Sequence, residues 1–463
     1  MKITIKNLGA LKQAEFTLGE MTILCGGNNT GKTYATYALY GFLSTWREGL
    51  SVDVASKNVS ELMAEGVTHI DINSYIENFE RILFDGCARY SNFLPTVFAA
   101  QKDKFKDSSF AVTVAAEHIK PFGKYERRMK AASKELFFIT KEETSSDVVV
   151  TLLVEKGRVR LPQDVIKKVI GDALKEIIFG QVFPNPFIAS AERTGAAIFR
   201  KELNFARNRL LEEMAKTDQS VNPVDLLFKT YQDYALPVKD NVDFTRQLET
   251  LAKKNSFIAE QHPDVLVTFS DIIGGEYRVT KNDELYYIPN GKKVKLTMDE
   301  SSSAVRSLLD IGFYLKHMAQ PGDLLMVDEP ELNLHPENQR RVARMFARLV
   351  NLGIKVFITT HSDYIVKELN TLIMLNHDKQ HLKNIAEREG YCRDELISSD
   401  QVKVYIAEES LVKLDGGQRR SYCQTLVPAD IDPELGIQAR SFDATIDSIN
   451  RIQEEIVWGE SEA

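Results

Sequence analysis

The spacing of apolar residues at the start of the chain predicts short β-strands followed by a helix. Within residues 1–25, apolar and polar positions alternate, and two glycine-containing turns divide the segment into three strands. Between residues 32 and 46 the apolar positions instead recur every three to four residues, the period of one helical face. The sequence therefore predicts a strand, a glycine-rich loop and a helix in direct succession.

Strands and helices also alternate in the C-terminal half. Buried strands are expected at 324–327 and 356–358, and amphipathic helices at 305–318 and 342–350. Such alternation is typical of a parallel sheet covered by helices. We therefore expect an α/β fold with a mixed or parallel sheet flanked by helices.

The middle of the chain is less regular and is expected to be mostly helical, with a few strands. The individual elements expected between residues 140 and 290 are a strand pair at 147–153 and 158–161, a strand at 187–189, a charged helix at 201–216, and strands at 265–269, 276–279 and 285–288. We accordingly divide the chain into four parts: 1–46 and 261–380 as two halves of one core, 47–260 as an insertion, and 381–463 as a mixed extension.

Composition places the chain among globular proteins. Of its 463 residues, 43% are hydrophobic and 27% are charged, which excludes disorder as its main character. No run of about 18 apolar residues occurs, so no membrane partner is expected. The four cysteines form no CxxC pair, which fits a reducing cytoplasm. The formal net charge is −8, which argues against a bulk nucleic-acid coat but allows a local basic face.

Residues 26–33 carry the most specific motif. They read Gly-Gly-Asn-Asn-Thr-Gly-Lys-Thr and fit the spacing G-x-x-x-x-G-K-[ST] between an expected strand and an expected helix. In this context backbone N–H groups cradle phosphates, the lysine reaches the β and γ phosphates, and the threonine hydroxyl binds Mg²⁺. The alternative, a chance glycine-rich turn, is disfavoured by the flanking elements. The candidate nucleotide-binding residues are Gly26, Asn28, Asn29, Thr30, Gly31, Lys32 and Thr33.

Acidic and imidazole side chains follow the two expected C-terminal strands. Asp328 ends the first strand and is the candidate ligand of Mg²⁺, while Glu329 can orient or deprotonate a water molecule. His361 follows the second strand and can hydrogen-bond a γ-phosphate oxygen. The alternative for the acids is a strand end that merely exposes them, and the co-occurrence with the glycine-rich loop disfavours it. The alternative for His361 is a structural histidine, and its position one helix and one strand after the carboxylates favours a functional role.

Serines precede the helix that begins near residue 305. The simplest interpretation of Ser302 and Ser303 is an N-cap. A sharper one is a phosphate-binding helix start that serves another subunit. Two basic groups, 120–134 and the arginines 340, 344 and 348, could likewise contact phosphates or acidic proteins, although solvated faces are the expected reading of each alone.

The order of these motifs resembles the heads of ABC-type ATPases. The segment Asp-Glu-Pro-Glu-Leu-Asn-Leu-His-Pro at 328–336 is similar to the OLD-like and SMC-like branch of the AAA/ABC ATPases, as are residues 3–16 and 442–446. The resemblance implies Walker A residues Gly26, Gly31, Lys32 and Thr33, with Asp328 as Walker B and Glu329 as catalytic base. It also implies a switch role for His361 and signature roles for Ser302 and Ser303, although Ala304 stands where the family usually has glycine. Gln181 and the turn at 190–193 are the candidates for the Q-loop.

The same resemblance implies ATP and Mg²⁺ as cofactors and a homodimer or higher oligomer with ATP at the interface. Neither the long coiled coil of the SMC-type repair proteins nor the Toprim motif of the OLD nucleases is recognisable. The layout is instead similar to the ATPase subunits of two-gene phage-defence systems, first AriA of PARIS and then PtuA of Septu. That similarity implies a sensor or scaffold that controls a separate effector nuclease and responds to a phage protein or DNA. A DNA-maintenance ATPase that binds DNA directly, and a nuclease whose centre lies in the insertion, remain alternatives.

Overall fold

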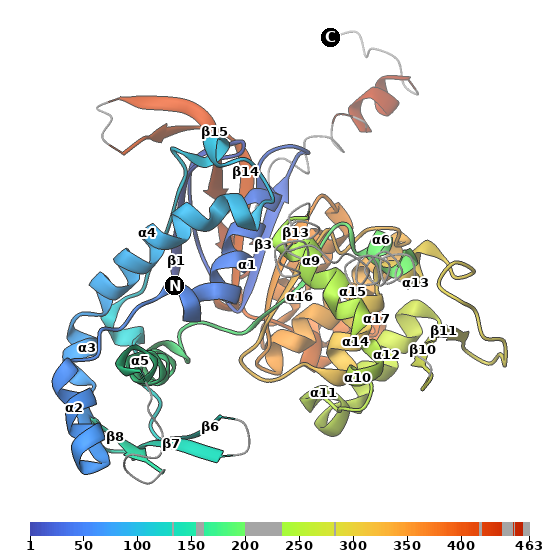
Figure 1. The fold of residues 1–463 in the computed structure, drawn as a ribbon. Coiled ribbons are helices and arrows are strands. Elements are labelled where there is room, and N and C mark those ends of the chain that lie inside the picture. The colour runs from blue at the N-terminus through green and yellow to red at the C-terminus, as the bar shows by residue number, and fades with distance from the viewer. Residues whose placement is uncertain are drawn as a thin grey trace, which may run out of the picture. The chain divides into compact units, whose positions relative to one another are not determined.

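The computed structural model describes residues 1–131, 134–153, 162–199, 234–281, 284–415, 419–437, 448 and 450–456. Two compact units emerge from it (Figure 1). Unit 1 comprises 1–4, 41–94 and 108–185, and unit 2 comprises 5–40, 95–107 and 186–463. Among the described residues, no helix is long and apolar enough to cross a membrane. The charged helix expected at 201–216 and the strand expected at 158–161 lie outside the described residues.

Unit 1 combines helices with an antiparallel sheet of four strands in the order β4-β8-β7-β6. Its core is formed by apolar residues of this sheet and of the helices α2 and α5. The expected insertion at 47–260 thus contains a folded unit that is sheet as well as helix. The elements with residues in unit 1, besides the first residues of β1 and the end of α1, are α2 (Ser56–Glu65), β4 (Val67–Asp71), α3 (Asn73–Glu77), α4 (Phe79–Val97), β5 (Ser109–Thr113), β6 (Tyr125–Ala131), β7 (Lys134–Lys141), β8 (Asp147–Leu152) and α5 (Gln163–Phe179).

Unit 2 is built around a sheet of six strands in the order β15-β14-β3-β13-β12-β9. All neighbours pair in parallel except β14 and β15, which are antiparallel. This confirms the mixed, mainly parallel sheet expected from the sequence. The strands are β3 (Met21–Gly26), β9 (Pro186–Ala189), β12 (Leu324–Asp328), β13 (Lys355–Thr360), β14 (Val402–Lys413) and β15 (Arg420–Pro428).

Two parts of this sheet lie outside the core segments expected from the sequence. Strand β9 comes from the expected insertion, and β14 and β15 come from the expected C-terminal extension. β14 pairs directly with β3, from Val402 opposite Met21 to Ala407 opposite Gly26. The segment at 381–463 therefore supplies two strands of the sheet that carries the glycine-rich loop.

Helices complete unit 2, and its main core joins β3, β12 and β13 to α14, α15 and α16. Its remaining elements are β1 (Lys2–Leu8), β2 (Leu11–Thr17), α1 (Lys32–Gly49), α6 (Arg193–Ile198), α9 (Leu236–Arg246), α10 (Leu248–Leu251), α11 (Phe257–Gln261), α12 (Pro263–Ile273), β10 (Gly275–Val279), β11 (Leu285–Pro289), α13 (Ser303–Ser307), α14 (Leu309–His317), α15 (Pro336–Asn351), α16 (Asp363–Leu375), α17 (Gln380–Glu389), β16 (Ile431–Asp432) and β17 (Gly436–Ile437).

The strand expected at 265–269 is wrong, because this segment lies within α12. Pro263 occupies the first turn of the helix, and Gly274 ends it with a left-handed backbone. Four buried residues, Val265, Phe269, Ile272 and Ile273, fall at i, i+4, i+7 and i+8 of one face. The β-branched residues at 265–268 are typical of a strand, but Pro263 before them and Gly274 after them are typical of the start and the end of a helix.

The arginines of α15 are occupied by carboxylates of the same chain. Glu368, which is 3% exposed, accepts hydrogen bonds from Arg340 (2.7 Å) and Arg344 (2.6 Å). Arg348 pairs with Asp264 and, at 2.6 Å, with Asp394. The row of arginines therefore forms an ion-pair network that joins α15 to its neighbours, while Arg340 keeps 38% of its side chain exposed.

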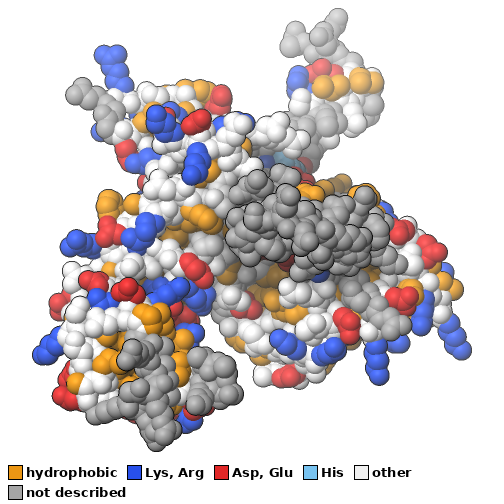
Figure 2. Space-filling model, viewed as in Figure 1, with side chains coloured by type: hydrophobic (Ala, Val, Ile, Leu, Met, Phe, Trp, Pro, Cys, Tyr) orange, Lys and Arg blue, Asp and Glu red, His pale blue; other side chains and the backbone are white. Residues whose placement is uncertain are grey.

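The basic group at 120–134 lies largely on β6 and the segment before it. Lys124 pairs with Glu126 at 3.0 Å, and Arg128 pairs with Glu135 at 3.1 Å. On the face shown in Figure 2, lysines and arginines are interspersed with acidic side chains over the described surface. These pairs dilute the positive charge on the described part of this group.

Candidate functional site

The glycine-rich loop joins the end of β3 to the start of α1. Its turn requires glycine at two positions: Gly26 has a φ of +130° and Gly31 a φ of +98°. A Cβ atom at Gly26 would lie 2.6 Å from the Ala407 carbonyl oxygen, and one at Gly31 would lie 2.6 Å from the Leu11 side chain. Strands β14 and β2 thus press against the loop, and only glycine fits there.

The lysine of the motif turns back onto its own loop. Its Nζ atom donates to the carbonyl oxygens of Gly26 (3.0 Å) and Gly27 (2.7 Å). Burial lowers the pKa of Lys32, while Glu329 and Asp328 favour its charged form. The ammonium group is therefore held beside the loop with carboxylates nearby.

Other residues of the motif face solvent. Asn28, Asn29 and Thr33 are exposed, and Asn29 has a left-handed backbone with a φ of +61°. The Thr30 hydroxyl donates to the Gly27 carbonyl at 2.8 Å and so closes the turn. The outer side of the loop is thus accessible to a phosphate chain.

Asp328 ends β12 next to Thr359 on β13. The two residues are paired in the parallel register, and the Thr359 hydroxyl donates to Oδ1 of the carboxylate. The side chain is almost fully buried, and its Oδ2 atom has no hydrogen-bond partner among the described residues. Burial raises the pKa of Asp328 from 3.8 to about 6, and the Thr359 hydrogen bond partly opposes this. A buried, unpartnered carboxylate oxygen is suited to bind a cation.

Glu329 follows with an unusual backbone, since its φ is +51°. Its N–H group donates to both the carbonyl (3.1 Å) and the hydroxyl (3.2 Å) of Thr359. Its carboxylate Oε1 atom lies 3.4 Å from Nε2 of His361, and both side chains are partly exposed. The structure therefore brings the acid and the histidine expected from two separate strands together at one edge of the sheet.

Glu331 is a residue whose role sequence reasoning missed. Its carboxylate accepts hydrogen bonds from the His361 N–H group (2.6 Å) and the Thr360 hydroxyl (2.9 Å), and burial raises its pKa. It therefore fixes the backbone that presents the histidine. The available signal was its place in the Asp-Glu-Pro-Glu segment at 328–331, where the third acidic residue is left without an assigned role in phosphate chemistry.

The two Q-loop candidates lie in different units. Gln181 is exposed in a turn after α5 of unit 1, whereas residues 190–193 follow β9 in unit 2, beside β12. Asn241 anchors this second turn, because it accepts from the Ser190 N–H group at 2.7 Å and donates to the Ile188 carbonyl at 2.5 Å. Glu192 accepts a 3.0 Å hydrogen bond from Tyr37 of α1. Only the turn at 190–193 shares unit 2 with the Asp328 strand end.

The serines at 302 and 303 begin α13. The Ser302 hydroxyl accepts from the Val305 N–H group at 3.3 Å, which confirms the N-cap interpretation. Arg306 donates to the carbonyl oxygens of Met298 (3.0 Å) and Ser301 (2.6 Å) and so closes the segment before the helix. These are local contacts, so within one chain Ser302 is engaged with its own helix.

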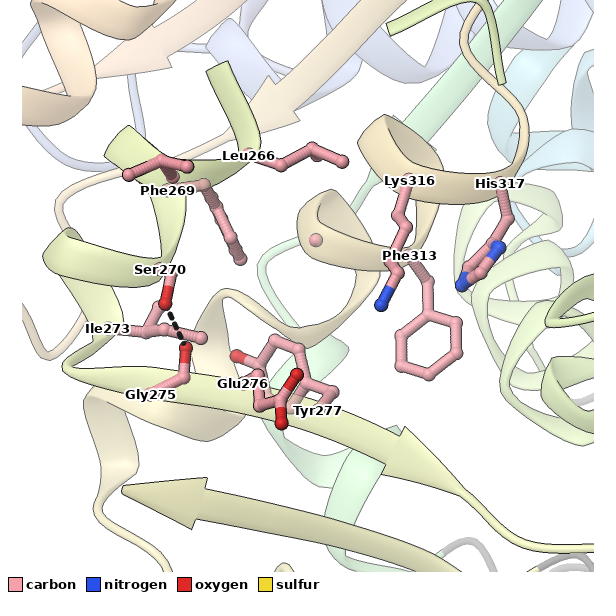
Figure 3. A pocket seen from close by; sticks show the side chains of 12 residues that line it. Leu266, Phe269, Ser270, Ile273, Gly275, Glu276, Tyr277, Phe313, Lys316 and His317 are labelled. Atoms are coloured by element: carbon pink, nitrogen blue, oxygen red, sulfur yellow. Dashed lines mark hydrogen bonds between the residues drawn. The ribbon is translucent and has the colours of Figure 1, made fainter. Parts of the chain in front are cut away.

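A separate hollow of about 250 Å³ lies between α12, β10 and α14 (Figure 3). Its lining is mostly apolar, with Lys316 and Glu276 among the polar side chains. The Tyr277 hydroxyl on one wall donates to the Val305 carbonyl of α13. The hollow thus adjoins the elements that carry Ser302, and it shares no residue with the glycine-rich loop.

The residues at the strand ends fit a magnesium nucleotide. Mg²⁺ prefers oxygen ligands and is usually held by one or two carboxylates together with phosphates and water. Asp328 offers a buried free oxygen, and Thr33 offers a hydroxyl at the start of α1. Among the described residues there is no group of three or more acidic, histidine or cysteine side chains that could hold a metal by itself.

The family model of the AAA ATPase domain matches residues 1–157 and 160–366. The chain therefore belongs to the AAA ATPase domain family, whose members use ATP. No protein with a curated description matches the chain.

Three solved structures are similar to the chain at low identity. An SMC head bound to the C-terminal winged-helix domain of ScpA has 13% identity and a TM-score of 0.32, with 91% of this chain and 97% of that chain covered. A Pyrococcus furiosus SMC head with an extended coiled coil, bound to the C-terminal domain of ScpA, has 14% identity and a TM-score of 0.31, with 98% of each covered. The Thermotoga maritima SMC head has 11% identity and a TM-score of 0.29, with 93% and 98% covered.

Replacing Asp328 by Asn is expected to stabilise the ligand-free protein at pH 8. Because its folded pKa of about 6 exceeds the unfolded value of 3.8, the folded state binds a proton more tightly, and stability is lost as the pH rises between these values. An amide carries no such charge, so the variant should gain about 1–3 kcal/mol at pH 8 and less at pH 5. Thermal unfolding at both pH values measures the gap.

The control is Asp85→Asn, which changes an exposed carboxylate of α4. Its effect should stay within about 0.5 kcal/mol at both pH values, as for most surface substitutions. If Asp328→Asn raises the free energy of unfolding by the same amount at pH 8 and at pH 5, the burial of a charged carboxylate is not the cause.

Proposed function

We propose that the protein hydrolyses ATP with Mg²⁺ at the strand ends of unit 2. In this proposal the backbone of 26–33 and Lys32 bind the phosphates, while Thr33 and Asp328 hold Mg²⁺, whose charge would offset that of the phosphate oxygens. The observation that carries the proposal is the parallel pairing of β3, β13 and β12, which puts the loop with Lys32 and the strand end with Asp328 and Glu329 at one edge of the sheet. The charges of both carboxylates favour the charged form of the lysine.

Glu329 is proposed as the general base. It is partly exposed, so water can reach it, and its carboxylate faces His361 at 3.4 Å. The imidazole is placed to hydrogen-bond a γ-phosphate oxygen and so to distinguish ATP from ADP. Glu331 is proposed to keep the histidine in position through its backbone.

Glu329→Gln should bind ATP but hydrolyse it about 10²- to 10⁴-fold more slowly, because the amide cannot accept a proton. Lys32→Ala should lose nucleotide binding as well. Phosphate release and equilibrium nucleotide binding, measured on the same preparations, separate the two effects. Glu337→Gln, an exposed substitution in the first turn of α15, serves as the control. Hydrolysis by Glu329→Gln at the wild-type rate would show that the base is another residue.

We further propose that ATP joins two copies of the chain. Ser302 and Ser303 of one copy would cover the γ-phosphate bound at Lys32 of the other, in a two-fold arrangement with two shared nucleotides. The support is the position of the serines at a helix start, where N–H groups can meet an anion, together with the family resemblance. Hydrolysis would then loosen the interface.

Sedimentation of the Glu329→Gln protein is expected to show a monomer without nucleotide and a dimer or larger species with ATP and Mg²⁺. Slow hydrolysis should preserve the assembled state long enough for the measurement. The control is the Lys32→Ala protein, which should show no ATP dependence. A Glu329→Gln monomer under both conditions at micromolar concentration, with a wild-type rate per chain that is independent of concentration, would exclude the shared site.

At the level of biology, we propose an ATP-driven sensor or scaffold that controls a separate effector nuclease in phage defence. The support is the similarity of motif order and layout to the ATPase subunits of two-gene systems, AriA of PARIS before PtuA of Septu. Unit 1 has a core of its own and offers a surface to a trigger or an effector that the nucleotide site does not need. The alternative is an ATPase that maintains DNA by binding it directly.

Duplex binding distinguishes the two. A sensor is expected to bind plain duplex DNA weakly, at micromolar Kd or worse, whereas a DNA-maintenance ATPase would bind tightly with an affinity that falls steeply as salt rises. Fluorescence anisotropy with labelled duplex at 50 and 200 mM salt measures this. Tight, salt-sensitive binding by the purified protein would favour the DNA-maintenance function and contradict the sensor proposal.

A further inference from the structure

Arg193 is a buried arginine that contacts the peptide groups behind the nucleotide site. It is the first residue of α6 and is 1% exposed. Its guanidinium donates to four backbone carbonyl groups, those of Asp328 (2.6 Å), Ser307 (2.7 Å), Glu329 (2.8 Å) and Ser190 (2.8 Å). One side chain therefore joins the ends of β9, β12 and α13.

Burying a charged guanidinium away from water costs free energy, so other contacts must compensate for it. Burial lowers the pKa of Arg193, and the largest opposing effect comes from the charge of the Asp310 carboxylate. That carboxylate is itself buried, and neither of its oxygens has a hydrogen-bond partner among the described residues. The guanidinium thus donates its hydrogen bonds to carbonyl groups and not to the Asp310 carboxylate. Its planar arrangement of N–H groups can reach several acceptors at once.

Two of these carbonyl groups belong to residues of the proposed catalytic centre. Glu329 has a left-handed backbone, a conformation that is strained for a residue other than glycine and persists only where surrounding contacts hold it. Thr359 holds its N–H group, and Arg193 holds its carbonyl group. Both peptide groups that flank the Cα atom of Glu329 are therefore held, and without Arg193 the restraint on the carbonyl side is gone.

Another of the four carbonyl groups belongs to Ser307, the last residue of α13. This helix begins at Ser303, and Ser302 caps its start. The guanidinium that holds the Glu329 backbone consequently also holds the segment proposed to meet the nucleotide of a second copy. A displacement at either place changes the hydrogen bonds available at the other.

We propose that Arg193 is a positioning residue that links the proposed catalytic base to the helix carrying Ser302 and Ser303. It touches no substrate and acts through Glu329 on hydrolysis and through Ser307 on assembly. The inference rests on the proposed ATP hydrolysis and adds the residue through which that site is coupled to α13.

A double-mutant cycle tests the proposal. Arg193→Met should lower kcat about 10- to 100-fold, the effect of a misplaced catalytic group. It should change the Kd for ATP by less than about threefold, since the four carbonyl groups that Arg193 binds all lie outside the loop at 26–33. In the Glu329→Gln background the same substitution should barely change the residual rate, because the group it positions is already inactive. Single turnovers with radiolabelled ATP measure all four rates.

Further variants keep the test independent of folding. Arg193→Lys retains the charge but cannot reach four carbonyl groups, so it should give an intermediate kcat. If the Arg193→Met protein does not fold, Arg193→Lys takes its place in the double-mutant cycle. Arg246→Met is the matched control, because Arg246 is also mostly buried but pairs with Asp243 on its own helix. Its kcat should equal that of the wild type.

The outcomes separate the inference from the proposed function. A wild-type protein without Mg²⁺-dependent hydrolysis contradicts the proposed function, and the inference falls with it. An active wild type in which the Arg193 and Glu329 losses multiply contradicts the inference alone. So does a loss of ATP binding that equals the loss in kcat, since this indicates a structural role. Weaker ATP-dependent assembly of Arg193→Met/Glu329→Gln than of Glu329→Gln alone supports the link to α13.

Discussion

Parallel pairing of β3, β13 and β12 determines where the chemistry of this chain meets. Thr360 lies opposite Cys25 at the start of the glycine-rich loop, and Thr359 lies opposite Asp328. A slip by one residue would leave the Asp328 carboxylate without the Thr359 hydroxyl and would bury both polar groups unpaired, at a cost of about 1–3 kcal/mol each. The register and the site therefore depend on the same contacts.

The site places more carboxylate than cationic charge in a poorly solvated region. Burial raises the pKa values of Asp328 and Glu331 and lowers that of Lys32. The charged form of each group is therefore less stable here than in water. A ligand that brings a cation and phosphates together would offset the charges of Asp328 and Lys32. Binding of that kind shifts the folding equilibrium toward the native state, so stability and ligand affinity are linked at this edge of the sheet.

The sequence predicts local features of this protein better than distant ones. The glycine-rich loop, β12 and β13 are recognisable because their signals lie within a few consecutive residues. Strand β14 is not, since its partner β3 precedes it by almost 400 positions and only the folded sheet reveals the pairing. α12 resembles a strand in its β-branched residues, and only Pro263 and Gly274 at its two ends mark it as a helix. The arginines of α15, for which a solvated face was expected, instead face carboxylates, which no spacing along one helix discloses.

Arg193 illustrates the same limit at the level of a single side chain. In the sequence it is one basic residue in a turn, while its acceptors at Ser307, Asp328 and Glu329 lie more than a hundred positions away. The left-handed backbone of Glu329 is equally invisible in the sequence, because glutamate, unlike glycine or asparagine, gives no sign of a positive φ. Strain of this kind persists only where surrounding contacts over-determine it. The buried guanidinium of Arg193 holds the Glu329 carbonyl group, and Thr359 holds the Glu329 N–H group. These contacts maintain the strained backbone and leave the carboxylate free to face His361.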